Sequence, residues 1–282
     1  MNIGIIGLGY VGTALKEGFK SCHNIETYDL IPKLSSCQSI NELVTKTQII
    51  FLCVPTPMNE DGSSNLDIIQ NTVKQIADNK NIKDKILVIK STVPPGTTEI
   101  LNKKYDNLDI IFNPEFLTES NFIEDFKNQN RIILGGPRPA TTILKQFYIN
   151  IFPNSTIIKT DSSYAEMVKY LANTFLATKV SFANEMKMIC DKLEIDYDKV
   201  VEYAIYDDRL GKSHWSVPGP DGKLGFGGSC FPKDINALIS TAIDLGLDPQ
   251  IIKSAWDLNL KIRPEKDWEE LKGRAVVKKT DN

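Results

Sequence analysis

The sequence predicts an α/β protein, with an N-terminal Rossmann-type doubly wound parallel sheet followed by an all-helical central domain. Short β-branched runs alternate with helical stretches in the first half of the chain, as they do in βαβ units. Runs such as IIFLCV and ILVIK are apolar without alternation, which is typical of strands covered on both faces. After about residue 160 the pattern becomes helical. We therefore expect one domain over residues 1–160, a second over 161–265, and a poorly ordered tail over 266–282.

The expected elements follow from these runs and from helix-start signals. The expected strands, in chain order, are Ile3–Ile6, Ile25–Tyr28, Ile49–Val54, Ile86–Lys90, Ile110–Phe112 and Ile132–Leu134. Ser163 and Glu166 fit a capping box at the start of a long helix that continues to about Leu193. Two further helices are expected near Pro232–Leu245 and Pro249–Ile262, because a proline occupies the first turn of each.

Composition and charge exclude several classes of function. The formal net charge of -3 argues against a nucleic-acid-binding protein, which usually carries a basic excess. No apolar run approaches the roughly 20 residues that span a bilayer, so no membrane segment is expected. The five scattered cysteines include no C-x-x-C pair, and there are only two histidines. This usage favours a cytoplasmic protein without a metal site.

A glycine motif predicts a dinucleotide site in the first domain. Gly7 to Gly12, GLGYVG, directly follows the first expected strand and opens a helix. Its glycines would allow a pyrophosphate to approach the backbone at the helix N-terminus. Asp29 closes the second strand, 17 positions after Gly12, where it would bind ribose hydroxyls and repel the extra phosphate of NADP. A glycine turn in an unrelated α/β protein is the alternative, but this context favours NAD.

A second glycine-rich segment, GFGGSCFPKD at 225–234, predicts a reactive cysteine. Pro232 marks a helix start, so Cys230 lies just before a helix N-terminus. The positive end of that helix and the charge of Lys233 would both favour the thiolate. Asp234 lies four residues after the cysteine and is suited to handle a proton or position a water molecule. The alternative, a buried inert cysteine, is a poor match to flanking glycines and charges.

This segment closely resembles the catalytic cysteine motif of the UDP-glucose/GDP-mannose dehydrogenase family, and Phe231 favours the UDP-glucose branch. Further family signatures follow in the expected order: GLGYVG at 7–12, VPTP at 54–57, STVPPGT at 91–97, NPEFLTE at 113–119, EMVKYLANTFLATKVSFANE at 166–185 and DRLG at 208–211. The resemblance extends to about residue 262. It implies NAD as cofactor, a UDP-sugar as substrate and a homodimer, and the charge and hydropathy add the expectation of no nucleic-acid and no membrane partner.

The resemblance also implies the chemistry of Cys230. The thiolate attacks an aldehyde intermediate, the thiohemiacetal loses a second hydride, and water hydrolyses the resulting thioester, so each turnover uses two NAD. Lys169 and Asn173 lie at i and i+4 on one helix and would stabilise the alkoxide and later oxyanions. Glu115 and Glu119 have the same spacing, and Glu119 would assist thioester hydrolysis. The alternative for Lys169 and Asn173 is a solvated polar stripe on the helix. The alternative for Glu115 and Glu119 is simple favourable placement near a helix N-terminus.

The resemblance also implies which residues are catalytic, which bind NAD and which bind the substrate, and some residues belong to two of these sets. The expected catalytic residues are Cys230, Lys169, Asn173, Asp234, Glu119, Glu115 and Thr92. The expected NAD-binding residues are Gly7, Gly9, Tyr10, Val11, Gly12, Asp29, Lys33, Pro55, Thr56 and Thr92. The expected substrate-binding residues are Phe116, Leu117, Lys169, Asn173, Arg209, Phe226, Gly227 and Lys233. Arg209 matches an arginine that reaches the substrate of the partner subunit in relatives, and a surface salt bridge is its alternative.

The chain departs from the family pattern in two places. Typical members continue into another Rossmann-like domain, which the residues after about 262 are too few to build, so we expect weaker nucleotide affinity and a wetter site. The segment Ser213 to Lys223, with His214 and Trp215, is either a substitute lid or an ordinary loop. The helix around Ile251–Leu260 resembles the family's dimer-building central helix, although a buried helix has the same periodicity.

The expected activity is therefore NAD-dependent four-electron oxidation of the C6 alcohol of UDP-glucose to UDP-glucuronate. The alternatives are the same chemistry on GDP-mannose or a UDP-N-acetylhexosamine, and a nucleotide-sugar-binding protein without turnover. A β-hydroxyacid dehydrogenase shares the architecture but has no use for a covalent cysteine. Replacing Cys230 by alanine or serine separates covalent catalysis from simple hydride transfer.

Overall fold

The computed structural model describes residues 1–278, which fall into two compact units. The first unit comprises Met1–Thr56 and Leu66–Lys169, and the second comprises Pro57–Asn65 and the chain from Tyr170 onward. The observed boundary lies nine residues beyond the expected one, because helix α7 (Ser162–Lys192) begins in the first unit and runs without a break into the second. The inclusion of residues 57–65 in the second unit has no counterpart in the sequence prediction.

The first unit is built around a sheet with strand order β2-β1-β3-β4-β5-β6-β7. Neighbouring strands pair in parallel except β5 and β6, which are antiparallel at Phe112 and Gly135, so the expectation of a wholly parallel sheet is wrong at that junction. Its elements are β1 (Asn2–Ile6), α1 (Tyr10–Phe19), β2 (Asn24–Tyr28), η1 (Pro32–Leu34), α2 (Ile40–Lys46), β3 (Ile49–Leu52), α3 (Asp67–Ala77), β4 (Ile86–Ile89), α4 (Thr97–Lys104), β5 (Asp109–Phe112), α5 (Phe122–Lys127), β6 (Arg131–Gly135), α6 (Ala140–Ile149) and β7 (Thr156–Thr160).

The strand order places a ligand-binding edge in the first unit. The chain leaves β1 for β2 on one side and then returns to β3 on the other side of β1. In open α/β sheets, ligands bind outside the carboxyl ends of the strands at such a reversal. Gly7 directly follows β1 and Cys53 directly follows β3, so the first glycine motif lies at this edge.

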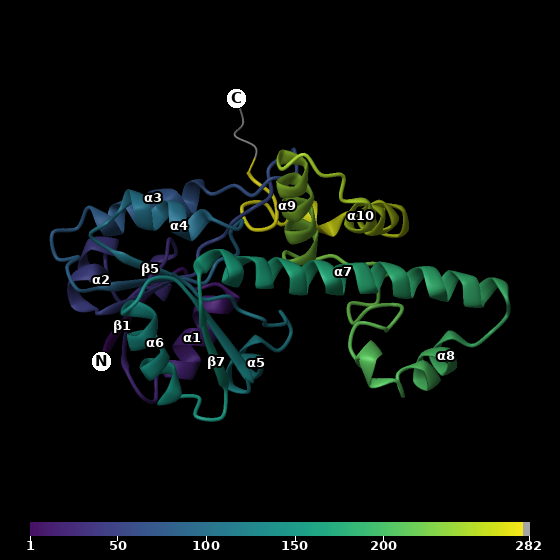
Figure 1. Cartoon of the computed structure of the whole chain (residues 1–282), viewed down its shortest axis with the longest axis horizontal. Helices are drawn as coiled ribbons and strands as arrows, with labels where there is room; N and C mark the ends of the chain where they lie inside the picture. The colour runs from purple at the N-terminus through teal and green to yellow at the C-terminus, as the bar shows by residue number, and fades with distance from the viewer. Residues whose placement is uncertain (279–282) are drawn as a thin grey trace. The chain divides into compact units, whose positions relative to one another are not determined.

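Apolar side chains of the central strands alternate between two cores. In β3, Ile50 and Leu52 pack with α2, α3 and α4, whereas Ile49 and Phe51 pack with α1, α5 and α6. Figure 1 shows α3 and α4 on one face of the sheet and α1 and α6 on the other. Because both faces are covered, β3 and β4 are buried along their whole length, as their unbroken apolar runs predicted.

The second unit is helical, as expected. After α7 its elements are α8 (Tyr197–Ala204), η2 (Asp208–Leu210), α9 (Phe231–Asp244), α10 (Gln250–Ile262) and η3 (Asp267–Glu270). Two small cores hold it together: one joins α7 to α9 and α10 around Phe226, and the other joins α7 to α8 around Val217. Helix α8 was not among the predicted elements.

The expected capping box at Ser163 and Glu166 is wrong. The Glu166 carboxylate accepts the N–H groups of Gly96 at 2.6 Å and Thr98 at 2.8 Å, so it caps the start of α4 rather than its own helix. Burial raises the pKa of Glu166, and these two N–H donors oppose that shift. The side chain therefore fastens the first turn of α4 to α7 within the first unit.

The segment expected to be poorly ordered from residue 266 is folded over its described part. Trp268 is buried and its ring centroid lies 5.1 Å from that of Trp256. The Met58 N–H donates to Ala275 O at 2.8 Å, and the Val277 N–H donates to Met58 O at 3.0 Å. The remainder of that expectation, residues 279–282, lies outside the described residues. No helix in residues 1–278 combines the length and apolarity that crossing a bilayer requires.

Candidate functional site

The loop after β1 has the geometry of a dinucleotide site. An added Cβ at Gly7, where φ is +89°, would lie 2.6 Å from Cys53 O, and one at Gly12 would lie 1.9 Å from Gly7 O. Both glycines are therefore required by close backbone packing. At Gly9, the N-cap of α1, an added Cβ would meet nothing within 4 Å, and no side chain caps the helix. Open space above a helix N-terminus fits a pyrophosphate.

Asp29 fastens this loop to the end of β2. Its carboxylate accepts the Leu8 N–H at 2.6 Å and the Ile31 N–H at 2.8 Å. An ionised carboxylate offers about four lone-pair positions, so two remain for the ribose hydroxyls that the sequence predicted. Lys33 is exposed on η1, four residues further along the chain. Tyr10 and Val11 form the first turn of α1.

The loops after β3 and β4 complete this edge of the sheet. Thr56 and Thr92 are buried, whereas Pro55 is exposed. The Ser91 hydroxyl donates to Val54 O at 2.6 Å, which ties the two loops together. The two threonine positions taken from the VPTP and STVPPGT motifs are thus held in a fixed arrangement on the first unit.

A buried ion pair follows β5. Lys169 Nζ donates to the carbonyl oxygen of Glu115 at 2.7 Å and to Glu115 Oε1 at 2.9 Å. Glu115 Oε2 accepts the Leu117 N–H at 2.7 Å. Burial raises the pKa of Glu115, but the Lys169 ammonium and the Leu117 N–H lower it by more than burial raises it. The net pKa therefore lies below the ordinary value, and the carboxyl stays ionised at neutral pH. Two of the expected catalytic residues, Lys169 and Glu115, are therefore ion-paired with each other.

The other residues of the NPEFLTE motif have different surroundings. Residues 113–118 form no helix, so the expected helical i, i+4 pairing of Glu115 and Glu119 is wrong, and Glu119 lies on the surface. The Arg131 guanidinium carbon lies over the Phe116 ring, 4.1 Å from the ring centroid, and Lys169 Nζ lies 5.5 Å from the same centroid. Leu117 packs against the core that contains α1 and α5.

Sequence reasoning missed Lys90, a buried lysine beneath this motif. Its Nζ donates to Asn113 Oδ1 at 3.0 Å, and the Tyr148 hydroxyl donates to the same oxygen at 2.6 Å. Burial lowers the pKa of Lys90 to about 8. The signal was the lysine that ends the apolar run ILVIK, which resembled an ordinary polar strand end.

The second unit brings four predicted residues together at the start of α9. Asn173 Nδ2 donates to Asp234 Oδ2 at 2.6 Å, and the Lys233 ammonium is bonded to Asp234 Oδ1. The Asp234 N–H donates to Cys230 O at 3.0 Å. Asp234 is buried and carries both contacts, so the Lys233 charge is paired with a carboxylate instead of acting on the thiol alone.

Cys230 differs from Cys53 in its position. It is the N-cap of α9, and its side chain is partly exposed. Cys53 is also partly exposed, but it lies after β3 and packs against the core of the first unit, where burial raises the pKa of its thiol to about 12. A helix N-terminus stabilises a thiolate, whereas at Cys53 the effect of burial exceeds the opposing effect of the Lys90 charge. Among these two, the thiol suited to act as a nucleophile is that of Cys230.

Two of the predicted substrate residues of the second unit, Phe226 and Arg209, differ in their exposure. Phe226 is buried, with ring centroids 6.1 Å from those of Phe231 and Trp256. Arg209 is instead exposed, with 89% of its side chain accessible, and its guanidinium pairs with Asp207. This is the surface salt bridge that was its alternative interpretation, and a contact with the substrate of a partner subunit stays a prediction.

The segment Ser213 to Lys223 is packed on α7 and α8. Trp215 Nε1 donates to Gly211 O at 2.9 Å, and the Tyr197 hydroxyl donates to Trp215 O at 2.7 Å. Val217 is buried in the core shared by α7 and α8. These contacts favour the ordinary-loop interpretation over a substitute lid.

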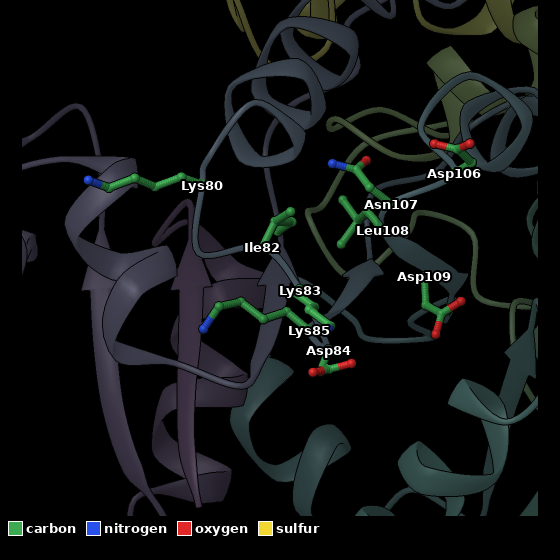
Figure 2. Close-up of a pocket in the computed structure, with 9 residues that line it drawn as sticks. All are labelled: Lys80, Ile82, Lys83, Asp84, Lys85, Asp106, Asn107, Leu108 and Asp109. Atoms are coloured by element: carbon green, nitrogen blue, oxygen red, sulfur yellow. The ribbon is translucent and has the colours of Figure 1, made fainter.

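A hollow of about 330 Å³ in the first unit is lined by none of the predicted site residues. Its lining residues, most of them charged, lie in the stretch 80–85, just before β4, and in the stretch 106–109, which ends in the first residue of β5 (Figure 2). It therefore lies at the amino ends of those strands, opposite the cofactor edge. Within residues 1–278, no three His, Cys, Asp or Glu side chains gather to hold a metal ion.

Comparison with known proteins matches both units to one family. Its NAD binding domain model, described as UDP-glucose/GDP-mannose dehydrogenase, matches residues 24–152, and its central domain model matches residues 163–261. UDP-glucose 6-dehydrogenase AglM of Haloferax volcanii is 33% identical over 303 residues, covering 92% of this chain and 69% of that protein. UDP-glucose 6-dehydrogenase TuaD of Bacillus subtilis is 31% identical over 299 residues, covering 93% and 63%.

A solved structure extends this likeness to three dimensions. The UDP-glucose dehydrogenase of Pyrobaculum islandicum aligns with a TM-score of 0.83 and 30% identity, covering 96% of this chain and 70% of that one. The chain thus spans roughly two thirds of the length of these relatives, between 63% and 70%.

Proposed function

The chain belongs to the UDP-glucose/GDP-mannose dehydrogenase family, with the family's NAD-binding domain in its first unit, and we propose that it oxidises UDP-glucose to UDP-glucuronate. One observation carries the proposal: a cysteine at the N-terminus of α9, whose carbonyl oxygen accepts the N–H of a buried aspartate that is held by an amide and an ammonium group. Simple hydride transfer does not need this arrangement, whereas covalent capture of an aldehyde does.

In the proposed reaction, Cys230 forms and breaks the only covalent bond to the protein. The thiolate bonds to the carbonyl carbon of the aldehyde, and the carbonyl oxygen becomes an alkoxide that takes up a proton. Transfer of the hydroxyl proton to a base, together with loss of the remaining hydrogen of that carbon as hydride, converts the thiohemiacetal into a thioester. Water then attacks the carbonyl carbon, and the sulfur leaves as a thiolate. NAD, when bound, accepts the hydride in each of the two oxidations.

Polar neighbours supply proton transfer and charge stabilisation in this proposal. Asp234, fixed by Asn173 and Lys233, is a proton acceptor close in sequence to the thiol. Asn173 and Lys169 are donors for the developing oxyanion. Glu119 and Thr92 hold and activate the hydrolytic water, and Glu115 keeps the Lys169 ammonium in place.

We also propose a cytoplasmic homodimer in which the second unit forms the subunit interface. Reduced thiols such as that of Cys230 persist in the cytoplasm. Tyr203 on α8, Leu245 at the C-terminal end of α9 and Ile251 in the first turn of α10 are large apolar side chains that are more than half exposed. Apolar surface of this kind is typical of a surface that a second subunit covers.

The first test is the stoichiometry of NADH formed from limiting UDP-glucose with excess NAD. Two NADH per UDP-glucose support the four-electron reaction, and one NADH contradicts it. Cys230→Ser abolishes formation of the acid, whereas Cys22→Ser, which changes an exposed cysteine of the first unit, leaves activity intact. An NAD-binding protein that reduces no NAD with UDP-glucose, UDP-N-acetylglucosamine or GDP-mannose overturns the proposed enzyme activity. Acid formed only from one of the other two sugars transfers the activity to that substrate.

A further inference from the structure

Side chains of α10 hold the glycine-rich loop that leads to Cys230. Asn259, which is fully buried, accepts the Phe226 N–H through Oδ1 at 2.7 Å and donates to Phe226 O through Nδ2 at 3.0 Å. One side-chain amide thus satisfies both backbone groups of a loop residue, as a neighbouring β-strand would. The preceding Gly225 N–H donates to Asn184 Oδ1 at 3.2 Å, so the loop is fixed from α7 as well.

A buried arginine one turn further along α10 joins three segments. Arg263 has 2% of its side chain exposed, and its Nε donates to Asp267 Oδ1 at 2.6 Å. Its Nη2 donates to Asp221 Oδ2 at 2.6 Å and its Nη1 donates to Leu224 O at 3.2 Å. The same Asp267 accepts the Gly228 N–H at 3.4 Å. A planar guanidinium with five donors can serve several partners in this fixed geometry.

The glycines of the loop are shaped to these side chains. An added Cβ at Gly225, where φ is +66°, would lie 2.3 Å from Asn259 Oδ1, and one at Gly227 would lie 2.4 Å from Arg263 Nη2. At Gly228 an added Cβ would meet nothing within 4 Å. Two of the three glycines therefore allow close approach to α10, and Gly228 is the one that leaves open space beside Cys230.

We propose that Asn259 and Arg263 are positioning residues for Cys230, an inference that rests on the proposed covalent function. A loop rich in glycine has many accessible conformations, yet a nucleophile must be held within about 1 Å of its working position. The amide of Asn259 and the cluster of Arg263 with Asp267 and Asp221 restrict the loop to one conformation. The thiol is thereby kept at the positive end of α9.

The test compares the reactivity of two thiols in one protein. Iodoacetamide labelling, quantified by mass spectrometry of each cysteine peptide across a pH series, reports the apparent pKa of Cys230, with exposed Cys22 of the first unit as internal reference. In Asn259→Ala and Arg263→Gln, the midpoint for Cys230 rises by about one pH unit, because the thiolate loses its fixed place at the helix N-terminus. The midpoint for Cys22 is unchanged.

Turnover gives the second readout. The kcat of both variants falls about 100-fold, as expected for a displaced reacting group, while the KM for NAD stays within about twofold. Asp257→Ala, on the exposed face of α10, changes neither readout. Tyr197→Phe removes the bond to Trp215 O and lowers the melting temperature without touching the loop, so it controls for loss of stability.

An unchanged Cys230 midpoint together with an unchanged kcat in a folded Asn259→Ala or Arg263→Gln protein overturns the proposal, whatever happens to the melting temperature. A Tyr197→Phe protein that reproduces both shifts also overturns it, because the effect is then one of general stability. Thiol labelling needs no turnover, so a protein that reduces no NAD contradicts the proposed function while this inference stays testable.

Discussion

The two glycine-rich loops of the molecule each lead into a helix, but they are constrained by different parts of the protein. In the first loop, added Cβ atoms at Gly7 and Gly12 would collide with backbone atoms of the first unit. In the second loop, added Cβ atoms at Gly225 and Gly227 would collide with the side chains of Asn259 and Arg263. The first loop is thus shaped by the fold itself, and the second by individual side chains of α10.

This difference affects how each loop responds to mutation and how it is recognised in a sequence. A backbone neighbour cannot move without distorting a strand or helix, so the first loop tolerates no change at its packed glycines. A side-chain neighbour can rotate or be replaced, so the second loop is adjustable through residues more than 30 positions away. The first loop suits a cofactor common to many enzymes, and the second suits one particular nucleophile.

The largest expected effect is that of Gly12→Ala. The new methyl group would lie 1.9 Å from Gly7 O, so that the loop or α1 must shift. We expect a loss of about 3 kcal/mol in the free energy of unfolding and NAD binding weakened at least about 100-fold. Urea unfolding and calorimetric titration with NAD measure the two effects.

The matched control is Gly9→Ala. Its φ of -68° suits alanine and an added Cβ meets nothing within 4 Å, so the unfolding free energy stays within about 0.5 kcal/mol. NAD affinity still falls, because the methyl group enters the space assigned to the pyrophosphate. Unaltered NAD binding in a folded Gly9→Ala protein would show that the cofactor does not approach this backbone.

Gly227→Ala has a smaller expected effect, since the obstacles are the ends of the Arg263 and Asp267 side chains. We expect a loss of about 2 kcal/mol, and a smaller loss when Arg263 is already replaced by methionine. A double-mutant cycle by urea unfolding measures this coupling. Equal costs in both backgrounds would mean that Arg263 does not limit the space at Gly227.

The sequence predicted local features better than distant contacts. Buried strands such as Ile49–Leu52 were found within two residues, because an unbroken apolar run is a signal contained in the strand itself. β7 was missed because TIIKT is polar and only partly buried at a sheet edge. Glu166 was assigned to the wrong helix, since its partners Gly96 and Thr98 lie 70 and 68 residues away.

In the candidate site, too, local motifs were predicted better than contacts between distant residues. The Asp29 prediction depended on a motif that places strand, loop and acid at fixed spacing, and the structure joins that carboxylate to the glycine loop. No motif marks Asn259 or Arg263, because their role depends on how α10 packs against the loop. Lys90 was missed for a similar reason: its burial is set by Asn113 and Tyr148, which come from other elements.

Buried cations give a second contrast between the units and a prediction about pH. Arg263 has two carboxylate partners, whereas Lys90 is bonded to neutral Asn113 and its pKa is lowered by burial to about 8. Between pH 8 and its ordinary pKa of 10.5, Lys90 keeps its proton in the unfolded chain but has released it in the folded protein. Its contribution to the free energy of unfolding therefore rises with pH across this window, by about 3 kcal/mol.

Lys90→Met removes that contribution. The difference in unfolding free energy, wild type minus Lys90→Met, should rise by about 3 kcal/mol from below pH 8 to about pH 10.5 in urea titrations. Groups that do not interact with Lys90, such as Tyr197, cancel in the difference, whereas Cys53, whose thiol pKa the charge of Lys90 lowers against the effect of burial, is replaced by alanine in both proteins. A difference independent of pH would mean that Lys90 keeps its proton in the folded state throughout.

Two of the arginines of the second unit, Arg209 and Arg263, give the smallest expected change in stability and the sharpest separation of roles. Arg209 pairs with Asp207 in full solvent, whereas Arg263 is enclosed, so Arg209→Ala should leave the melting temperature unchanged. If Arg209 contacts the substrate of a partner subunit, the KM for UDP-glucose still rises about tenfold, which corresponds to the free energy of one charged hydrogen bond.

Lys199→Ala, which breaks another exposed ion pair, is the matched control and changes neither the melting temperature nor the KM. Equal behaviour of the two variants in steady-state kinetics would leave Arg209 as a surface salt bridge. A rise in KM confined to Arg209→Ala would mean that an exposed side chain, without effect on its own fold, contributes to a substrate site.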